Sequence, residues 1–300
     1  MSRGFKFIVL IIGILAISVF LTPVVYHVLP FFKFEKILKR LIMIFFVASA
    51  FIYALMKRKK NNGKWISEEA LREYGLDFRL PWLRLIGWGF LVGIVAVSMV
   101  IIPDLIFGPR YLRHPILLQD VIERFFKGLL SGVVVGFIEE FFFRGFIYQN
   151  VLRKIGVFKS ILVTSIFYSL VHFLNYGQIF VPENPGLADA FRLLAGYLEP
   201  MVFRTREILP LFVGLLIFGV ALNVLVMRSG SLFMSIGLHA GAVFLVKFEA
   251  SFVRKGLEDY YHPFFGNPSH YDGWYEWLIL SLLVFMIWWL GRRFQTQAHS

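Results

Sequence analysis

The sequence predicts an all-α polytopic integral membrane protein, a helical bundle with about eight transmembrane helices. Of its 300 residues, 58% are hydrophobic and 35 are phenylalanine, and the mean hydropathy is +0.71. Several apolar runs are about 20 residues long, which is the length that an α-helix needs to cross a hydrocarbon core of about 30 Å. These observations together indicate a chain that lies mostly within a bilayer.

The expected membrane segments are 5–29, 37–56, 82–103, 117–152, 160–174, 208–227, 231–249 and 274–291. The first is too long for the core of a signal peptide and lacks a small-residue cleavage site, so we expect it to be retained. The fourth opens with the amphipathic stretch LLQDVIERFFKG, which favours a helix that starts in the membrane interface. Two long polar links remain: 57–81 is strongly charged, and 175–207 is apolar enough to hold an interfacial helix.

The formal net charge of +12 arises mainly from basic residues at the ends of the apolar segments. Lysine and arginine at such positions set topology and contact anionic lipid headgroups, so the expected partner is the bilayer rather than nucleic acid. An even number of spans puts both termini on one side, and a modest excess of basic residues favours a cytoplasmic location for both. The chain has no cysteine, which excludes disulfides, thiolate nucleophiles and cysteine-ligated metals.

Three sequence regions are expected. Residues 1–116 would hold the first membrane helices and a basic cytoplasmic loop, 117–250 a helical core, which the resemblance described below implies to be catalytic, and 251–300 a C-terminal loop with the last membrane helix.

Charged residues occur within the apolar segments, most densely in GFIEEFFFRGFIY at 136–148. An ionisable side chain at the middle of a membrane costs roughly 2.5–3.5 kcal/mol on insertion scales, so each one needs a partner or a function. The candidates that lie well inside predicted segments are Glu139, Glu140, Arg144, His172 and His239.

Helical geometry separates the two glutamates. Glu140 and Arg144 are four residues apart on one helix face, so they can form an ion pair. Glu139 points about 100° away and has no such partner on its own helix. An acid in this situation fits a general base, and His172 and His239 are candidates to meet it. We therefore assign the chemistry to Glu139 and a supporting role to Glu140 and Arg144.

These residues by themselves leave three interpretations open. The five side chains could form a structural polar cluster that joins helices, a pathway for protons or ions as in transporters, or a hydrolytic site.

The order and context of the motifs carry a resemblance. EEFFFR fits the pattern E-E-x-x-x-R; SIFYSLVHF follows in the next span, and GSLFMSIGLHAGAVF comes two spans later. This order resembles the CPBP family, which contains the type II CAAX prenyl endopeptidases and bacteriocin-processing and immunity-type membrane proteins. The resemblance covers roughly residues 118–250.

The resemblance implies an intramembrane endopeptidase, expected in a bacterial inner membrane, that cleaves a membrane-associated protein or peptide. Prenylated substrates are a family option. In this family the first glutamate of the pair activates a water with help from the histidine of the second motif, which here are Glu139 and His172. His239 contributes to the same site, and Glu140 and Arg144 match the remaining motif positions.

Two positions depart from the family pattern. Tyr168 stands four residues before His172, where phenylalanine is usual, and Val243 stands four residues after His239, where asparagine or aspartate is common. Because valine can neither donate a hydrogen bond nor bind metal, we considered Asn223 in the preceding span as a substitute.

The chemistry and two rival functions stay open at this level. Zinc or another divalent metal could be held by His172, His239 and Glu139; a metal-free glutamate mechanism fits the same residues, and the sequence has no H-E-x-x-H pair. The rivals are a catalytically impaired scaffold that binds other membrane proteins, which Val243 favours, and a proton-coupled transporter.

Overall fold

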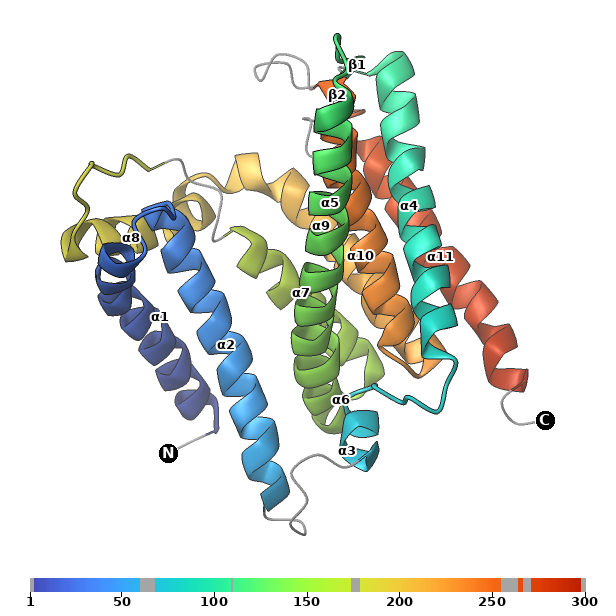
Figure 1. The fold of residues 1–300 in the computed structure, drawn as a ribbon. Helices are drawn as coiled ribbons and strands as arrows, with labels where there is room; N and C mark the ends of the chain where they lie inside the picture. The colour runs from blue at the N-terminus through green and yellow to red at the C-terminus, as the bar shows by residue number, and fades with distance from the viewer. Residues whose placement is uncertain are drawn as a thin grey trace. The chain divides into compact units, whose positions relative to one another are not determined.

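The computed structural model describes residues 3–59, 68–108, 110–173, 179–254, 264–266 and 271–297, and it is built almost entirely of helices (Figure 1). Each of the eight segments expected from the sequence coincides with helix. The α-helices are α1 (Arg3–Val28), α2 (Phe34–Lys59), α3 (Glu68–Glu73), α4 (Trp82–Phe107), α5 (Leu118–Glu140), α6 (Gln149–Ile155), α7 (Val157–His172), α8 (Leu187–Phe203), α9 (Thr205–Ser229), α10 (Phe233–Phe248) and α11 (Trp274–Gln297). A π-helix, η1 (Phe141–Tyr148), joins α5 to α6, and a short 3-10 helix, η3 (Glu249–Ser251), follows α10.

Some of these helices have the length and composition of membrane-spanning helices. Four helices in the described part of the chain are long and apolar enough to cross a membrane: Val9–Val28, Trp82–Phe107, Thr205–Ser229 and Phe233–Ser251. Val157–His172 and Trp274–Leu290 are apolar but shorter. Large apolar side chains on α4, such as Leu83 and Leu91, leave more than half of their surface uncovered by protein, as expected for a face in contact with lipid. The all-α membrane bundle is thus confirmed, whereas the count of eight spans stays a prediction.

The chain divides into two compact units. Unit 1 comprises 1–65 and 170–208, and unit 2 comprises 66–169 and 209–300. They interleave in sequence, because the chain passes from unit 2 to unit 1 near the end of α7. The units therefore do not coincide with the three sequence regions expected above.

Unit 1 contains α1, α2 and α8. The buried side chains of its core come from all three helices: Val19, Phe34, Leu38, Ile42, Ala190, Leu193 and Tyr197. The link 175–207 thus contains the helix that its apolar residues predicted, and this helix, α8, packs on α1 and α2. The charged link 57–81 contains α3, a six-residue helix that the sequence reading did not anticipate.

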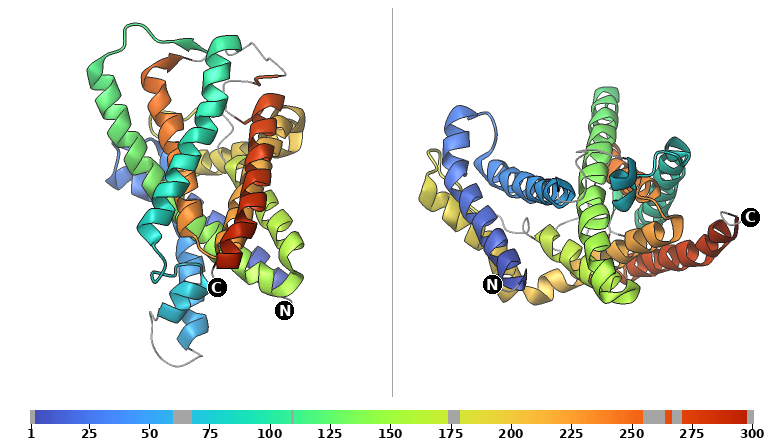
Figure 2. Two further views of the ribbon diagram at one scale, coloured as in Figure 1. Left: turned by 90° about the vertical axis from the view of Figure 1, so that its right-hand side faces the viewer. Right: turned by 90° about the horizontal axis from the view of Figure 1, so that it is seen from below.

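Helix α10 is the centre of unit 2 and packs on both α4 and α5 (Figures 1 and 2). Gly89 and Gly93 of α4 touch the α10 backbone: a Cβ at either would overlap the carbonyl oxygen of Met234 or Leu238. The relation is reciprocal, because a Cβ at Gly237 of α10 would overlap the Ile86 carbonyl. Small residues spaced by four allow membrane helices to approach this closely.

The contact between α5 and α10 is built in the same way. Gly132 and Gly136 of α5 lie against the backbone at Ala240, and Gly128 lies against Phe244. Earlier residues of α5 therefore contact later residues of α10, so these two helices are antiparallel. Glu139 lies three residues after Gly136, and His239 is next to Ala240, so this backbone contact brings the acidic pair and the histidine together.

An ion-pair network closes the far end of this helix group. Arg110 pairs with Asp104 at the end of α4 and, at 2.9 Å, with Glu249 in η3 just after α10; all three side chains are buried. The adjacent strands β1 (Tyr111–Leu112) and β2 (Val253–Arg254) are antiparallel, with Tyr111 opposite Arg254. The ends of α4 and α10 are therefore tied by charge as well as by packing.

The predicted segment 117–152 is helical, but it is not one regular α-helix. The eight residues Phe141–Tyr148 between α5 and α6 form a π-helix. π-helical turns are rare and often occur at functional sites, and this one begins directly after Glu140 and contains Arg144. Periodicity arguments assume 3.6 residues per turn, so they do not reveal this change of helix type.

The glycine packing yields a stability prediction. Gly93→Ala should destabilise the protein by about 1–3 kcal/mol, because the new methyl group meets the Leu238 backbone carbonyl, which cannot move aside. Gly87→Ala on the same helix is the matched control, since a Cβ there has open space around it. Unfolding in detergent micelles, followed by circular dichroism, measures both; equal stability of the two variants would contradict the close approach.

Candidate active site

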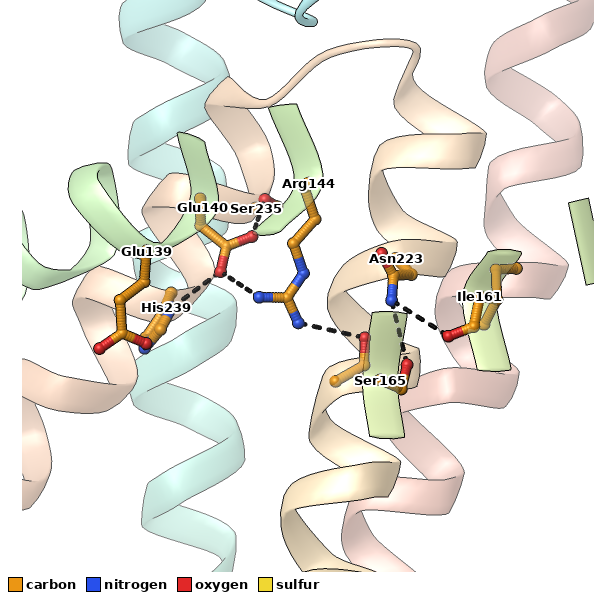
Figure 3. Close-up of polar contacts among 9 residues, drawn as sticks. Glu139, Glu140, Arg144, Ile161, Ser165, Asn223, Ser235 and His239 are labelled. Atoms are coloured by element: carbon orange, nitrogen blue, oxygen red, sulfur yellow. Dashed lines mark hydrogen bonds and ion pairs between the residues drawn. The ribbon is translucent and has the colours of Figure 1, made fainter. Parts of the chain in front are cut away.

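Glu140 is the centre of a buried cluster that joins α5, η1 and α10 (Figure 3). Its Oε1 accepts hydrogen bonds from the Arg144 guanidinium and from Nδ1 of His239, at 2.9 and 2.8 Å. Its Oε2 accepts one from the Ser235 hydroxyl at 2.5 Å. Glu140, Arg144 and Ser235 have no exposed surface. The ion pair predicted from the spacing of four residues is therefore present, and Glu140 has two further partners on α10.

The imidazole of His239 lies between the two adjacent glutamates. Nδ1 contacts Glu140, while Nε2 lies 3.9 Å from Oε2 of Glu139. Figure 3 shows the Glu139 carboxylate next to the ring, on the side away from Arg144. A carboxylate that is paired with a guanidinium accepts hydrogen bonds only, so Nδ1 of His239 carries a hydrogen and donates it to Glu140.

The two glutamates differ in access. The Glu139 side chain is 22% exposed, against 0% for Glu140 and 4% for His239. Glu139 is thus the acid of the pair that a small molecule can reach. The division of roles expected from helix geometry, in which Glu139 performs the chemistry and Glu140 has a supporting role, stays a prediction.

Aromatic rings surround the cluster. The Arg144 guanidinium carbon lies 4.5 Å from the centre of the Tyr168 ring, within cation–π range. The rings of Tyr168 and Phe218 approach the His239 ring edge-on, with centroids 6.3 and 5.7 Å away. Tyr168, which stands where the family pattern usually has phenylalanine, is thus buried beside the cluster and contacts the Arg144 guanidinium.

Arg144 also reaches across to α9. Its second terminal nitrogen donates to the Gly219 carbonyl at 3.3 Å. The fit is close, because a Cβ at Gly219 would crowd Tyr168 and Ser165 of α7. One arginine therefore links η1 to α5 by charge and to α9 by a backbone hydrogen bond.

Asn223 makes its hydrogen bonds to α7. Its amide donates to the Ser165 hydroxyl at 3.0 Å and to the Ile161 carbonyl at 3.5 Å, and the residue is fully buried. Figure 3 shows it on the α7 side of Arg144, separate from the carboxylates. The contacts described for Asn223 therefore join α9 to α7, and its suggested role as a substitute for the missing polar residue stays a prediction.

His172 and Val243 complete the set of positions considered from the sequence. His172 is the last residue of α7, one turn after Tyr168, and falls in unit 1, so its part in the site stays a prediction. Val243 lies one turn after His239 on α10 and is half-buried. The structure thus brings together Glu139, Glu140, Arg144 and His239 from the original set.

Ser235 is the residue of this cluster that the sequence reading undervalued. It stands four residues before His239, but the sequence alone does not place it in the site, because hydroxyls in membrane helices are usually packing residues. The useful signal was that spacing: residues four apart on α10 share a face, so a helix that brings His239 to Glu140 brings Ser235 too.

The fit of a catalytic metal can be tested against these donors. A catalytic zinc centre uses three protein ligands, whereas Glu139 and His239 provide one carboxylate and one ring nitrogen. Across the described ranges there is no group of three or more His, Cys, Asp or Glu side chains that could hold a metal ion. The described residues therefore do not form a three-ligand centre.

The fold and this site define a helical integral membrane protein with a buried carboxylate–histidine centre. A family model described as "Type II CAAX prenyl endopeptidase Rce1-like" matches residues 122–245, from α5 to α10, and so includes both glutamates, Arg144, His172 and His239. This match supports membership of the CPBP family, which contains the type II CAAX prenyl endopeptidases. Comparison with curated proteins found no match, and comparison with solved structures found none.

The cluster makes a prediction about stability. Arg144→Met should destabilise the protein by about 3–5 kcal/mol, because it leaves the buried Glu140 carboxylate without its counter-charge. The double variant Glu140→Gln/Arg144→Met should recover much of that loss, because it removes both charges. Unfolding midpoints in detergent measure both proteins; a double variant that is no more stable than Arg144→Met would show that the ion pair is not the stabilising interaction.

Proposed function

We propose that the protein is an intramembrane endopeptidase in which Glu139 activates a water molecule to attack a peptide bond. The observation that carries this proposal is the placement of one imidazole between two glutamates: Nδ1 of His239 is engaged by buried Glu140, and Nε2 faces the accessible Glu139. The match to the type II CAAX prenyl endopeptidase model supports the reaction class.

The separation between the two reactive groups suits a bridging water. At 3.9 Å, Oε2 of Glu139 and Nε2 of His239 are too far apart for a direct hydrogen bond. A water that donates one hydrogen to each would span this distance and would present its oxygen lone pairs to a substrate carbonyl. Glu140 holds the ring in the tautomer that this arrangement needs.

The proposed reaction moves one proton twice. Glu139 removes a proton from the water as its oxygen attacks the carbonyl carbon, which forms a tetrahedral intermediate. Glu139 then delivers that proton to the amide nitrogen as the carbon–nitrogen bond breaks, so the products are a carboxylate and an amine. His172 is proposed, from the family resemblance, to assist Glu139 and to stabilise the oxyanion.

The remaining charges favour this assignment of the base. The negative charge of Glu140 is balanced by Arg144, so Glu140 is committed to that ion pair. An activating base must also reach solvent or substrate, and Glu139 is the exposed member of the pair. The proposed substrate is a membrane-associated protein or peptide, because α10, which carries His239, and α9, which contacts Arg144, are apolar enough to cross a bilayer.

A scaffold that binds membrane proteins without cleaving them is the second candidate. The observation that favours it is Val243, which provides no polar group one turn after His239, where the family pattern has asparagine or aspartate. Cleavage distinguishes the two functions, because a scaffold would bind substrates and leave them intact.

The catalytic proposal predicts that Glu139→Gln lowers the cleavage rate by about 10²–10⁴-fold, the usual contribution of a general base. The assay is cleavage of a library of membrane-protein peptides, with and without a prenyl group, by protein purified in detergent, with bound metal measured in parallel. Glu123→Gln is the matched control, since it changes an exposed glutamate of the same helix.

The outcomes separate the functions. Loss of cleavage in Glu139→Gln with unchanged folding, together with full activity in Glu123→Gln, would support the peptidase. Retained cleavage in Glu139→Gln would eliminate Glu139 as the base. Peptide binding without cleavage by the wild-type protein would favour the scaffold.

The proposed setting is a bacterial inner membrane, with both termini in the cytoplasm. The basis is the excess of lysine and arginine near the segment ends on the side of the termini. A fluorescent protein fused after the C-terminus should be bright, and alkaline phosphatase fused there should be inactive, because the former folds in the cytoplasm and the latter in the periplasm. The reverse pair of results would invert the topology.

A further inference from the structure

Unit 1 contains a hollow of about 540 Å³, and none of the residues that line it belongs to the carboxylate–histidine cluster. Its walls come from the turn between α1 and α2, the first two turns of α2, residues 179–180 and α8. All of these segments belong to unit 1. Residues 179–180 and α8 lie within the part of the chain that matches the endopeptidase model, whereas the turn and α2 lie outside it. The volume falls in the range of small-molecule sites, roughly 300–1,000 Å³.

The polar lining of the hollow favours an anion. Lys33 and Lys39 contribute two ammonium groups, against the single carboxylate of Glu35. The Lys39 ammonium is positioned 4.9 Å from the centre of the Tyr197 ring, and the Tyr197 hydroxyl donates to the Glu35 backbone carbonyl at 3.2 Å. One lysine is thus held in place by a buried aromatic ring, while the other, Lys33, is exposed.

The apolar lining indicates that the anion carries a hydrocarbon portion. Leu193 and Tyr197 form a buried floor, each with 1% of its surface exposed. At the rim Phe180 is 88% exposed, and Ile179 beside it packs on the core of unit 1. A site for a free inorganic anion has no need of such a rim, whereas an amphiphile would cover it.

The position along the chain places the hollow at a membrane surface. Val9–Val28 is long and apolar enough to cross a membrane, and Lys33 follows its end by five residues. This is the level at which phospholipid phosphates lie and at which lysine side chains contact them. The charge of the lining, its apolar portion and its position near the membrane surface therefore all favour an anionic amphiphile as the ligand.

We propose that this hollow binds the headgroup of an anionic phospholipid. The phosphate lies between the ammonium groups of Lys33 and Lys39, each acting as a point charge with flexible donors. The acyl chains leave over Phe180 and Ile179 toward the surrounding hydrocarbon. The proposal does not depend on the peptidase assignment, because none of these residues takes part in the cluster around Glu140.

Lipid binding to the full-length protein tests the proposal. The protein is purified in a neutral detergent and titrated with phosphatidylglycerol, phosphatidylcholine, glycerol phosphate and inorganic phosphate, and the bound molecules are counted by native mass spectrometry. We expect one tightly held phosphatidylglycerol, weaker binding of phosphatidylcholine, and little retention of the two soluble phosphates, which lack the hydrocarbon portion.

Paired charge variants identify the site. Lys33→Gln/Lys39→Gln should weaken phosphatidylglycerol binding by roughly 30-fold, the effect of removing two lysines near a lipid surface. Lys36→Gln/Arg40→Gln is the matched control: it removes two charges from the first turns of α2, close in sequence to Lys33 and Lys39, at positions that do not line the hollow. Lys39→Arg, which keeps the cation over Tyr197, should retain binding and so distinguishes lost charge from lost packing.

Three results would overturn the proposal. Equal losses in the two double variants would indicate general surface charge rather than a site. Equal affinity for phosphatidylglycerol and phosphatidylcholine would show that the headgroup charge is not recognised. Retention of inorganic phosphate as tightly as the lipid would identify the hollow as a site for a soluble anion.

Discussion

The close backbone approach of α10 to α4 and α5 is the interaction on which the rest of unit 2 depends. Within a bilayer the hydrophobic effect does little to bring helices together, so packing and polar contacts must do so. Gly89, Gly93 and Gly237 let α4 and α10 touch, and Gly132 and Gly136 do the same for α5. A larger side chain at these contacts would move His239 away from the glutamates, and the site would open.

Once the helices are this close, the charges determine the arrangement of the site. A buried carboxylate is costly unless its lone pairs are satisfied, and Glu140 meets this condition with Arg144, His239 and Ser235. That set of contacts holds the imidazole in a single orientation. Two adjacent glutamates are useful because one anchors the ring while its neighbour, a third of a turn away, remains accessible at the other ring nitrogen.

The match to the endopeptidase model does not include all of the helices that hold the site together. It extends from α5 to α10, whereas α4, which supplies half of the glycine contact with α10, precedes it. The network of Asp104, Arg110 and Glu249 that joins the ends of α4 and α10 also lies outside the matched residues. Lys33 and Lys39 of the hollow in unit 1 lie outside the matched residues as well.

The sequence by itself determined the helical membrane class, the positions of the long apolar helices and the identity of four residues that lie together in the cluster. It could do so because apolar length, the spacing of four between Glu140 and Arg144, and the cost of burying charge are local properties. Only the tertiary structure decided that His239 contacts Glu140 directly, that Ser235 joins it, and that the amide of Asn223 bonds to α7. The π-helix after Glu140 and the division into two interleaved units likewise depend on how the helices pack. These features could not be read from the sequence, because they arise from contacts between residues that are distant along the chain, and helical periodicity carries no information on which faces meet.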